Sequence, residues 1–365
     1  TVPGFESPGE DTKISPLPNA LVLFNPALVL APLPGLELAN VGDRVPAERM
    51  GTDPKNISPA HHVKKGTPPT IIFHGKADTT VPYATAAAFT TVMKAAGNRC
   101  ELVGAEGEIL EAWGAPETII FPRSSSKMLQ AIPLIESGAA DAFGLTSSQL
   151  ALACASHQGA KLHVGHVNRW LADLGLTDDA LRCGPEPSRD QNYRDEMTCS
   201  GDPVCQVHNN CSGKHAGFLT LNKHIGGDAE YVDPAHPIQM MVREATESLT
   251  GEESAGYGID GCSAPNFAMS LHGLGRAMAF YASAHERSDV RSKAAARLTD
   301  AMRKHPELLA GEGRACTELM RAMDGRVSIK TGAEGVFIAI VPEKKIGIAL
   351  KIADGATRAS ECVMA

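Results

Sequence analysis

The chain has 365 residues, of which 43% are hydrophobic and 21% charged, so it can bury a sizeable core in one large domain or in two. Its net charge of -8 and the lack of a basic run interleaved with aromatic residues argue against nucleic acid as the main partner. We also expect no membrane span, because the best apolar stretch, residues 20–33, is interrupted by Asn25, Pro26 and Pro32.

The first residues and the cysteines predict the compartment. Residues 1–4 contain no basic stretch followed by an apolar one, so we expect no secretory signal. The nine cysteines are an odd number and do not form a compact disulfide framework. We therefore predict reduced thiols in a cytoplasmic protein.

Residues 1–104 are predicted to form a partial α/β unit of their own. Short apolar runs at residues 20–24 and 70–73 are bounded by Pro, Gly and Asn, which is typical of buried strands. The Ala-rich stretch 84–96 ends at a glycine and predicts a helix, and residues 100–103 predict the next strand. A strand, a helix and a strand in succession indicate an α/β layer.

From residue 105 the pattern changes to helices that lie between an early strand and a late hairpin. Residues 108–113 are strand-like, and the apolar spacing over residues 124–138 predicts a helix. Residues 335–341 and 345–352 predict an antiparallel hairpin. Further helices are predicted at residues 147–155, 162–174, 237–249 and 292–303. This order predicts a second domain over residues 105–365, in which helices cover a sheet, and not a βαβ succession.

The segment at residues 71–83, Ile-Ile-Phe-His-Gly-Lys-Ala-Asp-Thr-Thr-Val-Pro-Tyr, closely resembles the late part of α/β-hydrolase esterases. In that family the acidic member of the triad follows a strand that ends in His-Gly, and Asp78 holds that position. No Gly-x-Ser-x-Gly nucleophile elbow precedes residue 105, and residues 105–110, where a triad histidine is expected after the strand at 100–103, contain none. We therefore interpret Asp78 as a residue that caps a turn. A carboxylesterase fragment stays open as an alternative function.

A Ser-x-x-Lys motif opens the helix predicted after residue 123, in the sequence Arg123-Ser124-Ser125-Ser126-Lys127. Residues three apart share one helix face, so Lys127 can reach the Ser124 hydroxyl. A partly buried lysine loses basicity and can take the proton of a serine near neutral pH, which is acyl-transfer chemistry. Lys330-Thr331-Gly332 strengthens this interpretation, because penicillin-binding proteins and β-lactamases combine the two motifs. The alternative role of Ser124 is that of a helix N-cap.

A thiol, a lysine and a histidine share one helical turn or tight loop in Asn210-Cys211-Ser212-Gly213-Lys214-His215. A thiolate beside a lysine is stabilised, and it can act as a nucleophile or as a metal ligand. Cys262 can add a second sulfur, and two thiolates with a nitrogen suit Zn²⁺ with one open position. The alternative is a pair of unrelated buried thiols.

From about residue 105 to its end, the chain resembles the bacterial asparaginase II family, whose members are built like serine β-lactamases and glutaminases. The matching segments follow one another in the order of the family and are specific. They are residues 122–127, 152–157, 181–184, 210–218, 258–265, 310–314 and 347–355. The resemblance implies an α/β fold with a sheet like that of β-lactamases and penicillin-binding proteins, covered by helices and preceded here by the partial α/β-hydrolase segment.

The resemblance also implies two serine–lysine pairs and a zinc site. Ser124 would be the nucleophile and Lys127 its base, while Ser156 would pair with Lys351. The implied zinc ligands are Cys211, Lys214 and Cys262, with a water completing the site. A lysine that binds zinc must be neutral, which implies a strongly lowered pKa.

The implied substrate is L-asparagine, bound by Arg123, His215 and Asp260. The implied reaction is attack on the side-chain amide, loss of ammonia and hydrolysis of the acyl-enzyme to L-aspartate, without an organic cofactor. Family members often form homodimers, which leaves a homodimer open for this chain.

Both ends depart from the family pattern. Family members have an early strand before the position of Gly104, where this chain has the esterase-like segment. They also continue beyond residues 354–365 with a further strand. We therefore expect a chimera-like chain, truncated at both ends of its asparaginase part, with the junction at residues 104–107. A third interpretation is a zinc-binding protein whose serine–lysine pairs are inactive.

Overall fold

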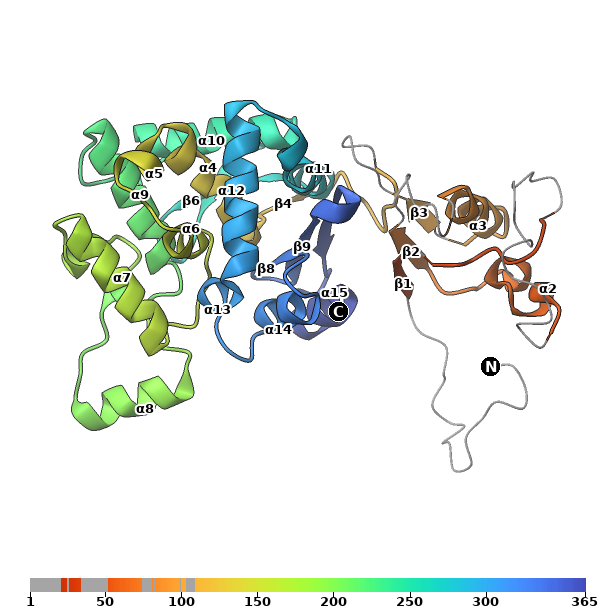
Figure 1. The fold of residues 1–365 in the computed structure, drawn as a ribbon, viewed down its shortest axis with the longest axis horizontal. Helices are drawn as coiled ribbons and strands as arrows, with labels where there is room; N and C mark the ends of the chain where they lie inside the picture. Colours follow the sequence, from red (N-terminus) through yellow and green to blue (C-terminus); the bar gives the residue numbers. More distant parts are fainter. Residues whose placement is uncertain are drawn as a thin grey trace. The chain divides into compact units, whose positions relative to one another are not determined.

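The computed structural model describes residues 21–24, 26–33, 52–73, 81, 83–98, 100–102 and 109–365. The chain divides into two compact units, and the second runs from Glu117 to Ala365 (Figure 1). The domain boundary predicted between residues 104 and 105 lies outside the described residues and stays a prediction. Asp78 lies outside them as well.

A three-stranded parallel sheet forms the centre of the first unit. Strands β1 (Leu21–Phe24), β2 (Thr70–Phe73) and β3 (Cys100–Leu102) pair in the order β1-β2-β3. Helix α3 (Tyr83–Ala95) leads from β2 to β3, because two parallel neighbours need a crossover between them. The predictions of three strands and one helix from the apolar runs are thus confirmed.

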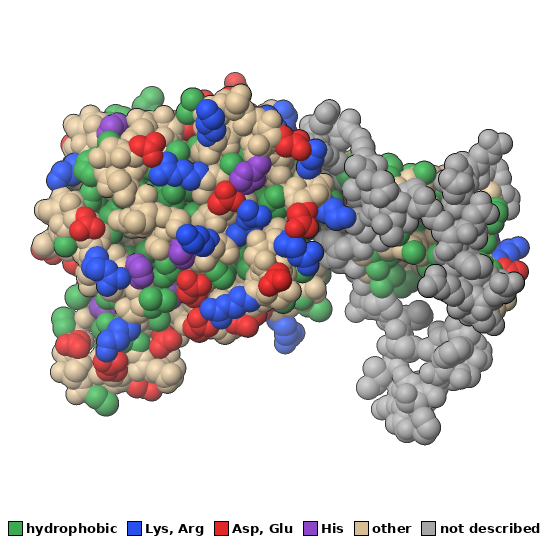
Figure 2. Space-filling model, in the orientation of Figure 1, with side chains coloured by type: hydrophobic (Ala, Val, Ile, Leu, Met, Phe, Trp, Pro, Cys, Tyr) green, Lys and Arg blue, Asp and Glu red, His purple; other side chains and the backbone are tan. Residues whose placement is uncertain are grey.

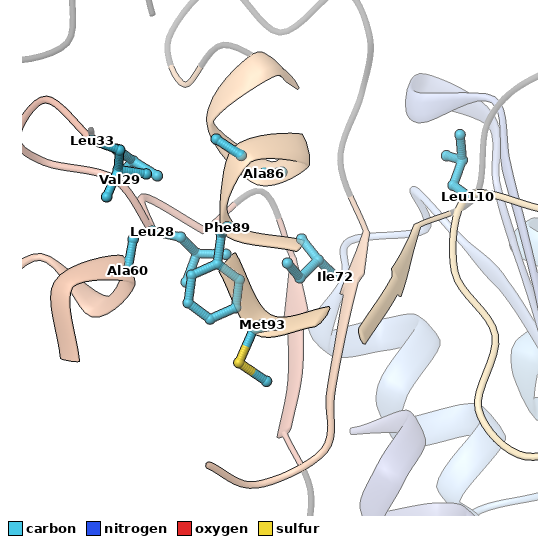
Figure 3. Packing of buried hydrophobic residues seen from close by; sticks show 10 residues of the cluster. Leu28, Val29, Leu33, Ala60, Ile72, Ala86, Phe89, Met93 and Leu110 are labelled. Carbon is cyan, nitrogen blue, oxygen red and sulfur yellow. The ribbon is translucent and has the colours of Figure 1, made fainter. Parts of the chain in front are cut away.

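The core of this unit lies between α3 and the sheet. Phe89 and Met93 extend from α3 beside Ile72 of β2, and Leu28 packs next to them (Figure 3). All four side chains are buried. Two short elements precede β2, namely α2 (Pro54–Ile57) and the 3₁₀ turn η1 (Pro59–His62).

Residues 109–113, which the sequence predicted as strand-like, are irregular. Their contacts with β2 come from side chains: the Glu111 carboxylate accepts the N–H of Ile72, and the Trp113 indole donates to Thr70 O at 2.9 Å. The segment therefore packs on the sheet without adding a strand to it.

Three antiparallel strands form the main sheet of the second unit. They are β8 (Ser328–Thr331), β9 (Val336–Val341) and β10 (Ile346–Lys351), in the order β10-β9-β8. The predicted late hairpin is confirmed, and its turn is the 3₁₀ turn η6 (Pro342–Lys344). Two short ribbons accompany this sheet. They pair β4 (Ile119–Ile120) with β7 (Met269–Ser270), and β5 (Tyr257–Ile259) with β6 (Pro265–Phe267).

Helices cover this sheet, as predicted. Helix α11 (Leu271–Ala282) packs on β10 so closely that a Cβ at Gly347 would lie 2.1 Å from the backbone nitrogen of Ala279. Five helices of this unit pack against one another (Figure 1): α4 (Lys127–Glu136), α6 (Ser147–Ala153), α9 (Ser212–Ile225), α10 (Pro237–Thr250) and α12 (Val290–Lys304). The other helices are α5 (Ala139–Ala142), α7 (Lys161–Asp173), α8 (Gln191–Ser200), α13 (Pro306–Leu309), α14 (Ala315–Ala322) and α15 (Thr357–Met364).

The second unit is thus a mixed α/β structure in which helices outweigh strands. The closer likeness of its sheet to that of β-lactamases stays a prediction. Within the described part of the chain, none of the helices combines the length and apolarity that crossing a membrane requires. On the face shown in Figure 2, basic and acidic side chains are interspersed over this unit.

Candidate active site

The Ser-x-x-Lys segment begins with a 3₁₀ turn, η2 (Arg123–Ser126), and α4 follows from Lys127. Ser124 is half-buried in this turn. The N-cap position of α4 belongs to Ser126, so the alternative in which Ser124 caps the helix is wrong. Neither η2 nor α4 has a side-chain cap, which leaves the Ser124 hydroxyl available for chemistry.

The side chain of Lys127 is almost fully buried, and its Nζ points inward. It donates to the carbonyl oxygen of Ala155 at 2.6 Å and to the Cys211 sulfur at 3.1 Å. The long side chain therefore runs toward the centre of the unit and away from a direct hydrogen bond with Ser124. Lys127 links the Ser-x-x-Lys turn to the thiol cluster, which the motif alone did not predict.

Ser156 pairs with Lys330. Strand β8 carries Lys330 into the interior, where 1% of its surface is exposed and its Nζ donates to Ser156 Oγ at 2.8 Å. The same ammonium group donates to Thr331 O at 2.8 Å. Burial, and then the nearby Lys127, lower the pKa of Lys330 to about 7. Lys330 is therefore partly neutral at neutral pH and can accept a proton there.

The predicted pairing of Ser156 with Lys351 is wrong. Lys351 donates to the carbonyl oxygen of the next residue, Ile352, at 2.6 Å. The register places both lysines on one face of the sheet, but β9 lies between their strands. Two strand spacings separate them by about 10 Å across the sheet. The Lys-Thr-Gly motif at Lys330 was the sequence signal for the correct partner.

Glycine at position 332 brings the Lys-Thr-Gly motif against the Ser-x-x-Lys turn. A Cβ there would lie 2.7 Å from Pro122 O and 3.2 Å from the Ser125 nitrogen, so a side chain does not fit. The next residue back, Thr331, donates its N–H to the Cys316 sulfur at 3.3 Å. The close approach at Gly332 joins the Lys-Thr-Gly motif to the η2 turn, and the contact with Cys316 joins β8 to α14 (Ala315–Ala322).

The three predicted zinc ligands gather beside this site. Cys211 directly precedes α9, and Lys214 lies in the first turn of that helix. Its Nζ donates to the Cys262 sulfur at 3.1 Å. Helix α9 can begin here because Gly213 packs on Leu152, where a Cβ would lie 2.5 Å from the carbonyl oxygen.

The cluster carries an ion pair. Cys211, and then Lys214 and His215, hold the pKa of the Cys262 thiol well below its usual range in spite of burial. Burial lowers the pKa of Lys214, but the negative charges of Cys262 and Cys211 raise it by more, so the pKa of this lysine lies above its usual value. Cys262 is thus favoured as a thiolate and Lys214 as an ammonium group. A zinc ion at Lys214 would have to displace that proton.

The donor set fits a zinc ion. Two sulfurs, one of them favoured as a thiolate, and one nitrogen are donors that Zn²⁺ prefers. Within the described ranges, no three His, Cys, Asp or Glu side chains are grouped so that they could hold a metal ion. A zinc site here would therefore depend on the Lys214 nitrogen, and its occupancy stays a prediction.

A relay of hydrogen bonds orients His215, which is fully buried. Its Nδ1 lies 2.9 Å from the hydroxyl of Tyr231, and that oxygen accepts the N–H of Arg182 at 2.9 Å. In the tautomer in which Tyr231 donates its proton to Nδ1, the histidine carries its own proton on Nε2. Among the described residues Nε2 has no hydrogen bond of normal geometry, although it lies close enough to Cys262 to affect the thiol. A buried N–H donor is thus available at the site.

Arg123 and Asp260 form an ion pair at this site. The Nε and one terminal nitrogen of Arg123 lie 3.0 Å and 2.9 Å from Asp260 Oδ1, and the other terminal nitrogen contacts Glu334. Arg123 has a φ of 53°, in the left-handed region that non-glycine residues seldom adopt. Asn266 holds this backbone: its Oδ1 accepts the Arg123 N–H at 3.1 Å, and its Nδ2 donates to Arg123 O at 3.4 Å.

The structure thus brings together most of the predicted residues and adds several that were missed. Ser124 and Lys127 belong to the Ser-x-x-Lys motif, and Ser156 binds the first residue of the Lys-Thr-Gly motif. The substrate-binding candidates Arg123 and Asp260 are in contact. Lys351 stands apart, as described above. Lys330 is the main addition. Tyr231 and Glu334 also join the site, and no local pattern marks them because their contacts depend on the fold.

Comparison with known proteins finds two family models that match different parts of the chain. The family model of L-asparaginase II matches residues 98–365. The BD-FAE family model matches residues 43–93. Among curated proteins, none matches the chain.

Solved structures of esterase 2 from Thermogutta terrifontis resemble the chain over a limited length. The native esterase is 50% identical over 28% of this chain and 36% of its own, with a TM-score of 0.24. The propionate-bound form is 53% identical over the same shares, with a TM-score of 0.24. The form phosphorylated by paraoxon is 50% identical over 28% of this chain and 34% of its own, with a TM-score of 0.22. The chain thus spans about a third of the length of these esterases. Because the L-asparaginase II model covers well over half of the 365 residues, including both serine–lysine motifs and the thiol cluster, the chain belongs to the L-asparaginase II family.

Proposed function

We propose that the chain hydrolyses the side-chain amide of L-asparagine to L-aspartate and ammonia through an acyl-enzyme on Ser124. The observation that carries this proposal is the buried hydrogen bond from Lys330 to Ser156 beside the Ser-x-x-Lys turn. It supplies a lysine whose pKa of about 7 lets it exchange protons at neutral pH. The family match supports an amide as the substrate.

The proposed reaction has two halves. In the first, Lys127 turns from Ala155 O toward Ser124 and takes the serine proton as Ser124 Oγ attacks the amide carbon. The carbon–nitrogen bond then breaks as the nitrogen leaves with a proton. The pair of Ser156 and Lys330 provides the path for that proton, because Ser156 can donate its own hydrogen while it accepts one from Lys330. In the second half, water attacks the ester and the serine is restored.

The remaining residues of the site position the substrate. Arg123 would bind its carboxylate and Asp260 its amino group, which requires their ion pair to open partly or to be shared. Cys211, Lys214 and Cys262 would hold a zinc ion, which supplies a fixed positive charge when bound. His215 presents its Nε2–H donor next to Cys262.

The test is ammonia release from L-asparagine by the purified chain, compared with Ser124→Ala and Ser126→Ala. Ser126 is the matched control, because its hydroxyl donates to Arg123 O within the same turn. We expect Ser124→Ala to abolish turnover and Ser126→Ala to retain most of it. Full activity of Ser124→Ala would refute the proposed nucleophile.

A mass-spectrometric search for the acyl-enzyme distinguishes the other interpretations. An adduct on the peptide that contains Ser124 supports the proposed route. Bound zinc without turnover and without an adduct would instead indicate an inactive zinc-binding protein. The carboxylesterase alternative rests on the match at residues 43–93, and no nucleophile elbow accompanies that segment.

A further inference from the structure

A groove with a volume of about 580 Å³ lies on the second unit, next to the proposed site. Its floor and walls are largely apolar and include Ile120, Phe121, Tyr257 and Ala268. Two charged residues, Glu334 and Lys351, line it as well. Neither the proposed hydrolysis of free asparagine nor the thiol cluster uses this groove.

The apolar side chains at this groove are unusually exposed. Phe121 is 44% exposed, Tyr257 53%, and the neighbouring Ile119 and Ile259 are 52% and 60% exposed. They stand close together: a Cβ at Gly258 would lie 3.4 Å from the Phe121 ring. Contiguous exposed apolar side chains are rare on ordinary protein surfaces, and where they occur they often mark a binding site.

The groove is continuous with the site. Phe121 precedes Ser124 by three residues, so their Cα atoms are at most about 11 Å apart. The lining residue Tyr257 belongs to strand β5, which ends at Ile259 directly before Asp260, and Asp260 pairs with Arg123. Glu334, a lining residue, contacts Arg123 too. A molecule bound at Ser124 can therefore extend into the groove.

One charged residue of the groove, Lys351, can bind a ligand that carries a carboxylate. Glu334 contacts Arg123, but Arg123 also pairs with Asp260, so Glu334 keeps part of its negative charge. Lys351 donates one hydrogen bond to Ile352 O, and an ammonium group has three donors. Lys351 thus retains donors for an anion beside the apolar walls.

We propose that the groove binds the amine half of β-aspartyl amides, so that the chain hydrolyses β-aspartyl dipeptides with an apolar second residue. This inference rests on the proposed function, because the scissile bond is the same side-chain amide. The apolar side chain of the leaving amino acid lies against Phe121 and Tyr257, and its carboxylate pairs with Lys351. Ser124 Oγ forms the bond to the carbonyl carbon, the carbon–nitrogen bond breaks, and the nitrogen leaves as the amino group of that amino acid after gaining one proton. Water then releases aspartate.

The experiment compares kcat/KM for β-aspartyl-leucine, β-aspartyl-glycine and L-asparagine with the full chain. We expect β-aspartyl-leucine to exceed β-aspartyl-glycine by at least about ten-fold, since a leucine side chain in an apolar pocket gives discrimination of this order. Tyr257→Ser should remove most of that preference. The control is Val290→Ser, which removes a side chain that is 63% exposed on α12, away from the groove, and should leave the preference unchanged.

The outcomes separate this inference from the proposed function. Hydrolysis of L-asparagine without hydrolysis of β-aspartyl-leucine would overturn the inference and leave the proposed function standing. Failure with every amide would overturn both. Equal rates for the two dipeptides, together with a change from dimer to monomer in Tyr257→Ser, would show that the groove is an interface between copies and would also overturn the inference.

Discussion

Replacing Lys330 by methionine is expected to stabilise the folded protein at pH 6 and to abolish its activity. Burial and Lys127 lower the pKa of Lys330 from 10.5 to about 7. That difference corresponds to about 5 kcal/mol of destabilisation when the buried lysine is protonated. Between the two values the unfolded chain binds this proton and the folded chain does not, so the free energy of unfolding rises with pH. The destabilisation is complete below pH 7 and is absent above pH 10.5.

Methionine also removes the hydrogen bonds to Ser156 and Thr331. Leaving a buried partner unsatisfied costs about 1–3 kcal/mol for each bond, which offsets roughly half or more of the gain. We therefore expect Lys330→Met to be more stable than the original protein at pH 6 by at most about 3 kcal/mol, and to be less stable than it at pH 10. Activity should fall at least about 100-fold at every pH, because the proton path ends at Lys330.

Urea unfolding at pH 6, 8 and 10, with ammonia release measured on the same samples, tests both parts. Lys304→Met is the matched control, since Lys304 is exposed near the end of α12 and its replacement should give no such pH dependence. A difference in unfolding free energy that is constant from pH 6 to pH 10 would refute the lowered pKa. Retained turnover in Lys330→Met would refute its role in proton transfer.

Three further predictions concern the rest of the site. Tyr231→Phe should lower kcat/KM at least about ten-fold, and it should let the His215 proton move between Nδ1 and Nε2. ¹⁵N NMR of the imidazole measures this change, and an unchanged Nε2–H signal would contradict the relay. Gly332→Ala should cost about 1–3 kcal/mol of stability in urea unfolding, because the new Cβ would clash with Pro122 O; a neutral effect would contradict the close approach. Cys262→Ser should lower the zinc retained after dialysis, as measured by elemental analysis, and equal retention would exclude this sulfur as a ligand.

Most helices and strands could be predicted because apolar spacing and the residues at the ends of an element lie within a short stretch of sequence. The apolar runs gave the strands of the first unit, and the helices around α4 and α12 followed from apolar spacing and terminal residues. The prediction of a strand at residues 109–113 was wrong. The side chains of Glu111 and Trp113 bind this segment to β2, and no backbone ladder joins the two. Periodicity cannot distinguish these two ways of packing on a sheet.

The site was predictable as a set of motifs but not as a set of contacts. Ser-x-x-Lys and the Cys211 segment indicated the chemistry, yet the partner of Ser156 depended on the order of the strands. Lys330 and Lys351 share a face, and only the position of β9 between them decides which one reaches the serine. The inward path of Lys127 likewise depends on where Ala155 and Cys211 lie in the folded unit.

The left-handed backbone at Arg123 bears on how this protein can be improved in the laboratory. A non-glycine residue at a φ of 53° costs on the order of 1 kcal/mol, and here the Asn266 side chain holds the strained peptide in place. Arg123→Gly relieves that strain while it removes the guanidinium group from Asp260. A directed-evolution screen for heat resistance alone would respond only to the balance between the relieved strain and the lost ion pairs with Asp260 and Glu334, and it would not protect catalysis. Variants of this chain should be selected on turnover after heating, so that the two properties are tested together.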